Sequence, residues 1–248
     1  MKISIITATY DSGATIKDTM DCIRSQDYGN IEHIIVDGKS ADDTLAIVAG
    51  YPHVSRVVSE KDNGLYDAMN KGIAMATGDV IGILNSDDIY SGPWVLSTVA
   101  RTFEKKGVMT AYGDLQYVHP QDTARVIRTW KSGSFRRENF YYGWMPPHPT
   151  FFVRKEIYGQ VGGFNTTLRS AADYELMLRI LLKHDFPTFY IPKTLVKMRT
   201  GGTSNASLHN RIKANGEDRL AWKLNELKPY FFTLYLKPLR KIHQFILK

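Results

Sequence analysis

Apolar residues in the first hundred positions form short continuous runs, separated by segments in which they recur at helical spacing. Continuous runs predict strands covered on both faces, and a spacing such as that of Ile16, Met20 and Ile23 predicts a helix. The runs fall at residues 3–8, 34–36, 56–59 and 80–84. This alternation predicts an α/β fold with a mainly parallel central sheet and helices on both faces.

The second half of the chain has a different pattern. Two longer strands of antiparallel type, a shorter strand and an amphipathic helix are expected at 108–118, 124–130, 150–153 and 173–184, in that order. Residues 208–248 are predicted to be helical, with interruptions at Pro229 and Pro238.

Polar residues follow three of the strands predicted in the first half. They are Tyr10 with Asp11, Asp37 with Gly38, and the run 85–88. In open parallel sheets, ligands bind at the carboxyl ends of the strands. The sequence therefore predicts a binding site where these three strand ends converge.

The adjacent carboxylates Asp87 and Asp88 are the sharpest chemical feature. At the end of an apolar strand they repel each other and are poorly solvated, and a divalent cation such as Mg²⁺ or Mn²⁺ would relieve both effects. In the alternative interpretation, Asp88 caps the next turn and Asp87 faces water. The pair alone does not decide between them.

Composition limits the classes of protein. The chain of 248 residues has one cysteine, Cys22, which excludes an intramolecular disulfide and favours a reducing compartment. The first apolar run is too short for a secretory signal, and none approaches the roughly 20 apolar residues of a membrane span, so we expect a cytoplasmic protein. A net charge of +7 favours anionic partners. The absence of a GxxxxGK run disfavours P-loop chemistry. No nucleic-acid module is recognised, so we expect nucleotides or phosphates as partners and no nucleic acid.

Basic and aromatic residues are concentrated near the end of the chain. Positions 228–248 contain no acid, and their basic and aromatic residues are Lys228, Lys237, Arg240, Lys241, Lys248, Tyr230, Phe231, Phe232, Tyr235 and Phe245. This composition predicts peripheral contact with an anionic membrane, on its inner face. Packing of the aromatics on the domain, or on a second subunit in a homodimer, is the alternative.

Four segments, in their order and spacing, resemble the family-2 glycosyltransferases of the GT-A fold: MKISIITATYDSG, IIVDGKSADDT, ATGDVIGILNSDDIY and AADYELMLR. The resemblance covers roughly residues 1–200 and looks closest to small non-processive bacterial enzymes that build surface polysaccharides. It implies a Rossmann-like GT-A domain over 1–207, with a nucleotide-binding half (1–90) and an acceptor half (91–207), followed by the basic aromatic tail 208–248.

The implied activity is transfer of a sugar from a nucleotide-diphosphate sugar to an acceptor hydroxyl, with inversion and with Mn²⁺ or Mg²⁺. The acceptor would be a saccharide or a lipid-linked saccharide of the bacterial surface. The resemblance places four residues in a first donor loop, with Tyr10 near the base: Thr7, Ala8, Thr9 and Tyr10. Asp37 would accept a hydrogen bond from the base or the ribose. That role favours a UDP-type donor, although thymine and guanine also present imide hydrogens.

The remaining implied roles lie further along the chain. Three residues of the helix after Gly64 would flank the nucleotide and its phosphates: Asp67, Asn70 and Lys71. The run Asn85, Ser86 and Asp87 occupies the DxD position, where Asp87, supported by Asp88, would bind the metal. Asp173 occupies the position of the general base. His148 and Glu175 are weaker candidates for the acceptor side.

Several of these residues have structural alternatives. Asp37 can start a turn, Lys71 can be a solvated helix residue, and Asp173 can be a helix N-cap. His148, among three prolines, can equally be a structural loop residue.

The sequence departs from the family pattern at Asn85, where an acid is usual, and at Ala172, where Glu is common. Two rival functions therefore stay open. One is a non-catalytic nucleotide-sugar-binding protein of the same fold. The other is a metal-dependent phosphohydrolase or nucleotidyltransferase, which would release phosphate or pyrophosphate rather than a nucleoside diphosphate.

Overall fold

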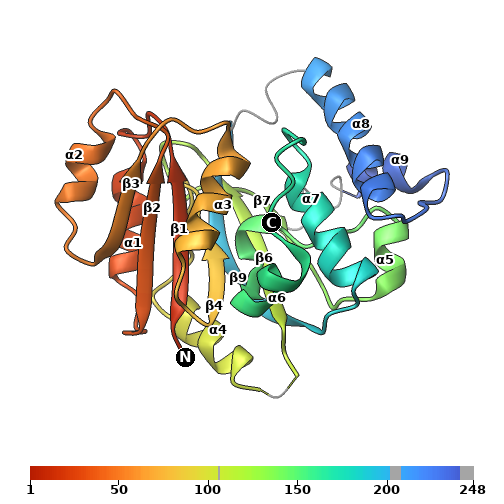
Figure 1. The fold of residues 1–248 in the computed structure, drawn as a ribbon, viewed down its shortest axis with the longest axis horizontal. Helices are drawn as coiled ribbons and strands as arrows, with labels where there is room; N and C mark the ends of the chain where they lie inside the picture. Colours follow the sequence, from red (N-terminus) through yellow and green to blue (C-terminus); the bar gives the residue numbers. More distant parts are fainter. Residues whose placement is uncertain (106, 202–207, 241–248) are drawn as a thin grey trace.

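The computed structural model describes residues 1–105, 107–201 and 208–240 (Figure 1). Nine strands form one sheet in the order β3-β2-β1-β4-β8-β6-β9-β5, and β7 pairs with β6. The sheet continues from the first half of the chain into the second, so both halves contribute to a single framework.

The first half forms the parallel part of the sheet. Strands β1 (Ile3–Thr9), β2 (Ile31–Asp37), β3 (Val54–Ser59) and β4 (Val80–Ile83) run parallel to one another, and β4 pairs antiparallel with the next strand of the sheet. Helices connect them, namely α1 (Ile16–Arg24), α2 (Thr44–Ala49) and α3 (Leu65–Met75). This arrangement confirms the α/β prediction.

Alternating residues of the central strands are buried in different clusters. Ile6 of β1 packs with Met69 of α3, whereas Ile5 packs with Val99 of α4 (Val95–Phe103) on the other face. Figure 1 accordingly shows α3 in front of the sheet and α1 behind it. Burial on both faces explains why these strands are continuously apolar in sequence.

The second half adds antiparallel and mixed pairing. Strand β6 (Thr110–Val118) lies antiparallel to β7 (Val126–Trp130) and β8 (Phe152–Arg154), as the sequence predicted for its longer strands. Strand β9 (Thr188–Arg199) runs parallel to β6 and also pairs with the short β5 (Ile89–Tyr90). The sequence pattern did not predict β9, because its burial is irregular and Pro192 interrupts its apolar residues.

The helices of the second half surround the front face of the sheet. They are α5 (Arg137–Tyr141), the 3₁₀ turn η1 (His148–Thr150), α6 (Lys155–Val161), and α7 (Ala172–Met177) with its π-helical continuation η2 (Leu178–Lys183). The predicted helix at 173–184 therefore exists, but its second half is a π-helix rather than an α-helix.

The C-terminal part contains α8 (Leu208–Leu224) and α9 (Thr233–Leu239). Pro229 lies between these two helices, as expected. Pro238 is the penultimate residue of α9, which ends at Leu239, so the helix stops one residue beyond the predicted interruption. Residues 241–248, with Lys241, Phe245 and Lys248, lie outside the described part of the chain.

Candidate functional site

The polar ends of the parallel strands meet at one edge of the sheet. Thr9, the last residue of β1, lies opposite Asp37, the last residue of β2. The loop after β1 also contacts the run that follows β4, because the Ser12 and Ser86 hydroxyls are 2.8 Å apart. The predicted convergence of strand ends is therefore present.

The expected donor loop begins later than the sequence suggested. Thr7, Ala8 and Thr9 are the last residues of β1 and are buried, because pairing with β2 continues to the end of both strands. Tyr10 lies beyond the strand and is 66% exposed, so its ring is available to a ligand.

Gly38, the residue after β2, is closely approached by two side chains. A methyl group placed on Gly38 would be 2.7 Å from Asp62 Oδ2 and 3.3 Å from Tyr10 Cδ2. The Tyr10 ring and the Asp62 carboxylate thus both lie against the Gly38 backbone, which brings an exposed aromatic ring and a carboxylate together at the end of β2. Sequence reasoning missed Asp62, although a carboxylate two residues before Gly64 was a usable signal.

The Asp37 carboxylate is occupied by its own chain. Its Oδ2 accepts hydrogen bonds from the backbone N–H groups of Lys39 and Ser40, at 3.1 and 3.0 Å, and from the Ser59 hydroxyl at 2.6 Å. Its Oδ1 accepts a hydrogen bond from the Ser40 hydroxyl. These contacts match the turn-starting alternative, and contact of Asp37 with a base or ribose stays a prediction.

The three polar residues predicted on α3 make local contacts. Lys71 pairs with Glu60 at 2.8 Å and lies 3.6 Å from Asp67, whose Oδ2 accepts a hydrogen bond from the Asn63 N–H. Asn70 binds Phe164 twice, since its amide N donates to the carbonyl and its amide O accepts from the N–H, both at 2.8 Å. Asn70 therefore joins α3 to the segment before α7, and the donor roles of all three stay predictions.

The carboxylate pair after β4 has two different environments. Asp87 is partly exposed, whereas Asp88 is buried, and its Oδ1 finds no hydrogen-bond partner among the described residues. Burial and the charge of Asp87 raise the pKa of Asp88 to about 8. Asn85 Oδ1 is a second buried acceptor without a described partner. Asp88 therefore does not act as the turn cap considered from sequence.

These atoms fit a divalent cation that also binds a ligand. No cluster of three His, Cys, Asp or Glu side chains that would enclose a metal occurs within residues 1–105, 107–201 and 208–240. One or two carboxylates with substrate phosphates is, however, a usual way to hold Mg²⁺. Asp87 with the unpartnered oxygens of Asp88 and Asn85 provides such a partial set.

The predicted base, Asp173, comes from a helix of the second half of the chain. Asp173 is the second residue of α7, and Ala171 occupies the N-cap position, so the N-cap alternative for Asp173 is wrong. Its Oδ2 lies 3.2 Å from His148 Nδ1, and its Oδ1 accepts a hydrogen bond from the Tyr66 hydroxyl at 3.4 Å. The structure therefore unites three residues that are far apart in sequence.

His148 interacts electrostatically with Asp173 and with the carboxylate pair after β4. Burial lowers the pKa of His148, but the hydrogen bond and charge of Asp173, with the charges of Asp88 and Asp87, raise it above its ordinary value. Burial would raise the pKa of Asp173, yet the hydrogen bond and charge of His148 bring it below the usual range. His148 thus lies within electrostatic range of both the metal candidates and the base candidate.

Glu175 is buried in a structural network. It forms an ion pair with Arg179, with 2.7 Å between Oε2 and Nη2, and accepts a hydrogen bond from Asn225 Nδ2 at 3.1 Å. These contacts tie α7 to α8, and an acceptor-side role for Glu175 stays a prediction without a supporting contact in the described part of the chain.

Arg199, at the end of β9, is a site residue that sequence reasoning missed. Its guanidinium donates to the Asp87 carbonyl at 2.6 Å and to the Pro120 carbonyl at 2.9 Å, and forms an ion pair with Asp18. It therefore holds the backbone of the proposed metal ligand. No local pattern marked it, because β9 itself was not predicted.

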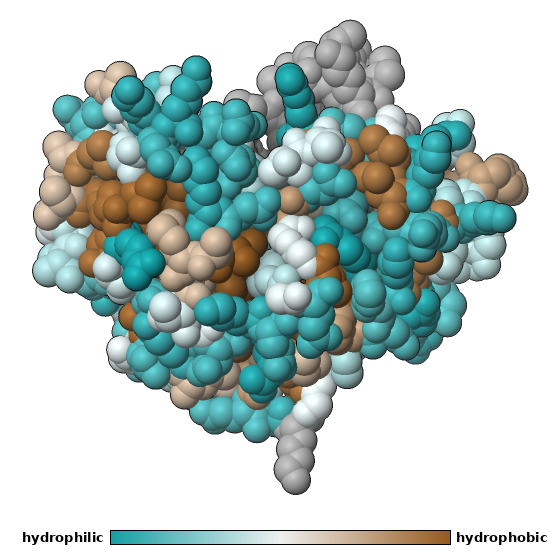
Figure 2. Space-filling model, in the orientation of Figure 1, coloured by the Kyte–Doolittle hydropathy of each residue, from teal (hydrophilic) through white to brown (hydrophobic). Residues whose placement is uncertain are grey.

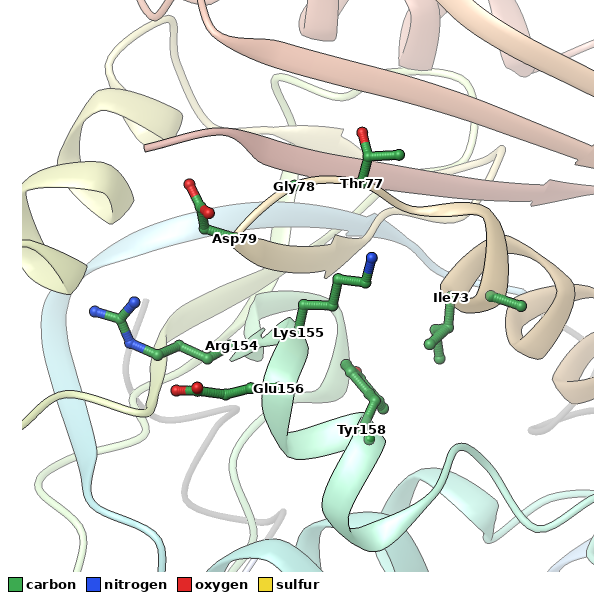
Figure 3. A pocket seen from close by; sticks show the side chains of 10 residues that line it. Ile73, Thr77, Gly78, Asp79, Arg154, Lys155, Glu156 and Tyr158 are labelled. Carbon is green, nitrogen blue, oxygen red and sulfur yellow. The ribbon is translucent and has the colours of Figure 1, made fainter.

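A separate pocket of about 590 Å³ lies at the edge of the sheet where β4 begins, opposite the edge where the parallel strands end (Figure 3). Ile73 and Tyr158 form its apolar wall, and Asp79, Lys155 and Glu156 surround it. It shares no residue with the site at the strand ends. The nucleotide site is therefore expected elsewhere than in this pocket.

Known sequences agree with this geometry. The sequence profile of Glycosyl transferase family 2 matches residues 4–174, which include the strand ends, Asp87 and Asp173. The chain belongs to glycosyl transferase family 2. An uncharacterised glycosyltransferase of Mycobacterium tuberculosis is 33% identical over 183 residues, or 73% of this chain and 69% of that protein. A PGL/p-HBAD biosynthesis glycosyltransferase of Mycobacterium bovis is 28% identical over 208 residues, or 82% of this chain and 78% of that protein.

Solved structures show the same fold for this family-2 chain. Staphylococcus aureus TarS, crystallised with UDP-GlcNAc, superposes with a TM-score of 0.67 at 18% identity, over 91% of this chain and 65% of that chain. A mannosyltransferase of Pyrobaculum calidifontis, in complex with GDP-Man and Mn²⁺, superposes with a TM-score of 0.66 at 18% identity, over 98% and 70%. The GT-A fold expected from the sequence is thus confirmed.

Proposed function

We propose that this family-2 chain transfers a sugar from a nucleoside diphosphate sugar to an acceptor hydroxyl, with inversion at the anomeric carbon. One observation carries the proposal: His148 contacts Asp173 while lying within electrostatic range of Asp87 and Asp88. The metal candidates and the base candidate therefore act on the same imidazole. A donor diphosphate on one side and an acceptor hydroxyl on the other would bring the reacting atoms together between them.

Each protein group has a distinct task. Tyr10 stacks on the base beside Gly38, and Asp62 offers a carboxylate to its edge. Asp87, with Asp88, would hold Mn²⁺ or Mg²⁺, which when bound supplies positive charge beside the diphosphate. Asp173 remains ionised at neutral pH, because its pKa is lowered, and accepts the proton of the acceptor hydroxyl.

The donor is proposed to be of the UDP type, and the acceptor a saccharide or glycolipid of the cell envelope. The UDP-GlcNAc and GDP-Man complexes of the structural neighbours support a nucleotide sugar in general. The role of the M. bovis relative in PGL/p-HBAD biosynthesis supports an envelope glycolipid.

Thermal shift with UDP, GDP and dTDP sugars in the presence of Mn²⁺ tests the donor. We expect one nucleotide class to raise the melting temperature of the wild type, with no such rise in Asp87→Ala. Asp27→Ala, which changes a carboxylate outside the site, is the matched control. An equal shift in Asp87→Ala would remove the metal assignment. Release of nucleoside diphosphate, rather than phosphate or pyrophosphate, separates a glycosyltransferase from the hydrolase and binding-protein alternatives.

We also propose that the C-terminal surface contacts an anionic membrane. Phe231 and Tyr235 are 89% and 62% exposed, and Lys228 and Arg240 are exposed nearby in the acid-free stretch 228–240. Figure 2 shows hydrophobic side chains on the surface at the end of the molecule formed by α8 and α9. Aromatic rings with flanking cations suit the headgroup region of an anionic bilayer. No described helix has the length and apolar character needed to cross a membrane.

The other face of this segment packs on the domain. Thr233 donates a hydrogen bond to the Tyr141 carbonyl at 2.6 Å, Leu234 is buried, and Lys237 forms an ion pair with Asp218 at 2.6 Å. Both sequence interpretations of the tail therefore have support, on opposite faces of α9. Removing the tail would also remove these packing contacts.

Point substitution is consequently the better test of membrane contact. The double variant Phe231→Ser/Tyr235→Ser should float less with vesicles of phosphatidylglycerol and phosphatidylcholine than the wild type. Val57→Ser, which removes an exposed apolar residue from β3, should float like the wild type. Equal flotation of all three proteins would reject the proposal, and binding to pure phosphatidylcholine would reject the role of charge.

A further inference from the structure

His148 is held in place by its backbone. It opens η1, where the Phe151 N–H donates to the His148 carbonyl at 3.1 Å and the Thr150 N–H to the Pro147 carbonyl at 3.0 Å. The buried Thr150 hydroxyl also donates to the Gly113 carbonyl of β6 at 3.1 Å. The imidazole therefore projects from a turn anchored to the sheet, rather than from a free loop.

The two oxygens of the Asp173 carboxylate are not equivalent. Oδ2 lies 3.2 Å from His148 Nδ1, whereas Oδ1 accepts a longer hydrogen bond of 3.4 Å from the Tyr66 hydroxyl. In the neutral imidazole with hydrogen on Nδ1, the ring donates to Oδ2 and leaves Nε2 without hydrogen. Oδ1 is then the oxygen that a substrate hydroxyl can approach.

The surroundings of the ring reinforce this orientation. Acidic groups act on His148 from two elements, with Asp173 on α7 and Asp87 and Asp88 after β4. A hydrogen on Nδ1 toward Asp173 is thus favoured electrostatically. Without that donor, the effect of burial, which raises the pKa of Asp173, would be opposed only by the charge of Lys237 and the backbone N–H of Tyr174 among the causes described for this group.

We propose that His148 is the positioning residue of the base, binding Asp173 Oδ2 through Nδ1–H so that Oδ1 faces the acceptor hydroxyl. This inference rests on the proposed function. In the reaction, the acceptor O–H bond breaks and its proton passes to Oδ1. The freed electron pair forms the bond from oxygen to the anomeric carbon, while the bond to the diphosphate breaks and its electrons leave with the nucleoside diphosphate. His148 keeps its own hydrogen throughout.

Two substitutions separate positioning from other roles. His148→Leu removes the donor, and His148→Asn replaces Nδ1–H by an amide N–H at a similar position. The assay is release of nucleoside diphosphate to water from the sugar donor selected by thermal shift, with Mn²⁺. Melting temperature and donor-induced shift report folding and donor binding separately.

We expect His148→Leu to lower kcat about 100-fold, the cost of a misplaced catalytic group, with an unchanged donor-induced shift. Its acidic limb of kcat/KM should move to higher pH, because Asp173 loses the donor that lowers its pKa. His148→Asn should restore most of the lost activity and return the limb toward its original position. A residue with a merely structural role would not move this limb.

Two results would overturn the proposal. Wild-type kinetics in His148→Leu would show that the contact is unimportant, and an Asn variant as slow as the Leu variant would assign the proton to His148 itself. If the wild type releases no nucleoside diphosphate from any donor, the proposed function fails instead. The inference is then decided by ¹⁵N NMR, with the His148 signal assigned by its loss in His148→Leu. A neutral ring with hydrogen on Nε2, or a spectrum unchanged by Asp173→Asn, would contradict it.

Discussion

Arg199→Met should destabilise the protein and weaken donor binding together, because one guanidinium supports both β9 and the backbone of Asp87. The Arg199 side chain is 8% exposed and donates to the carbonyls of Asp87 and Pro120. Its ionic partner Asp18 is 54% exposed, so that pair is screened by solvent. The two carbonyl bonds should therefore dominate the loss.

The magnitude follows from these contacts. A hydrogen bond from a charged donor contributes about 1.5 kcal/mol or more, so losing two lowers the free energy of unfolding by about 3 kcal/mol. The exposed Asp18 pair adds less than about 1 kcal/mol. Methionine preserves most of the apolar packing of the arginine stem, so the loss reports mainly the polar contacts.

Urea unfolding of Arg199→Met, Asp18→Asn and the wild type measures these contributions. Asp18→Asn should cost less than about 1 kcal/mol, since the carbonyl bonds remain. The donor-induced thermal shift should fall in Arg199→Met and persist in Asp18→Asn. If the two variants lose the same stability, the carbonyl bonds do not support the fold and the reasoning is refuted.

Three further predictions concern the strand-end site. The raised pKa of Asp88 means that the folded state holds its proton more tightly than the unfolded state, so metal-free stability should fall as pH rises from about 4 to about 8. Asp88→Asn should flatten this slope in thermal unfolding, and an unchanged slope would contradict the assignment. Asp37→Asn should cost about 2 kcal/mol in urea unfolding, because a neutral amide cannot replace a carboxylate that accepts four hydrogen bonds from backbone and hydroxyl groups; unchanged stability would count against it. Gly38→Ala should reduce the donor-induced thermal shift, because the added methyl group would displace Asp62 and Tyr10, whereas Gly29→Ala, with nothing within 4 Å of its added methyl group, should not. Equal shifts in the two glycine variants would show that the ligand does not approach Gly38.

Local sequence patterns predicted the parallel part of the fold well, for a physical reason. β1, β2 and β4 are buried on both faces, so each is a continuous apolar run that any window along the chain detects. β9 is only partly buried, contains a proline and joins the sheet through distant partners. Its existence depends on tertiary pairing, which a local pattern does not contain.

For the candidate site, too, local segments could be predicted from sequence but contacts between distant residues could not. Asp87 and Asp173 were predicted because the family resemblance marks their segments. The contact of Asp173 with His148, and of Arg199 with Asp87, joins residues that are distant in the chain and was not predicted. The sequence offered a turn at Asp37 only as an alternative. It could not show that the Asp37 carboxylate accepts hydrogen bonds from its own chain, because one of the donors is Ser59 of the next strand.

The double hydrogen bond between Asn70 and Phe164 bears on how such enzymes can be recombined. A methyl group on Gly163 would lie 2.3 Å from Asn70 Oδ1, so this contact also requires a glycine before Phe164. Asn70 belongs to residues 1–90 and its partners to residues 91–207, so a chimera crossing near residue 90 would inherit them from different parents. Exchange of residues 91–207 between relatives should succeed only where both parents carry this matched asparagine and glycine.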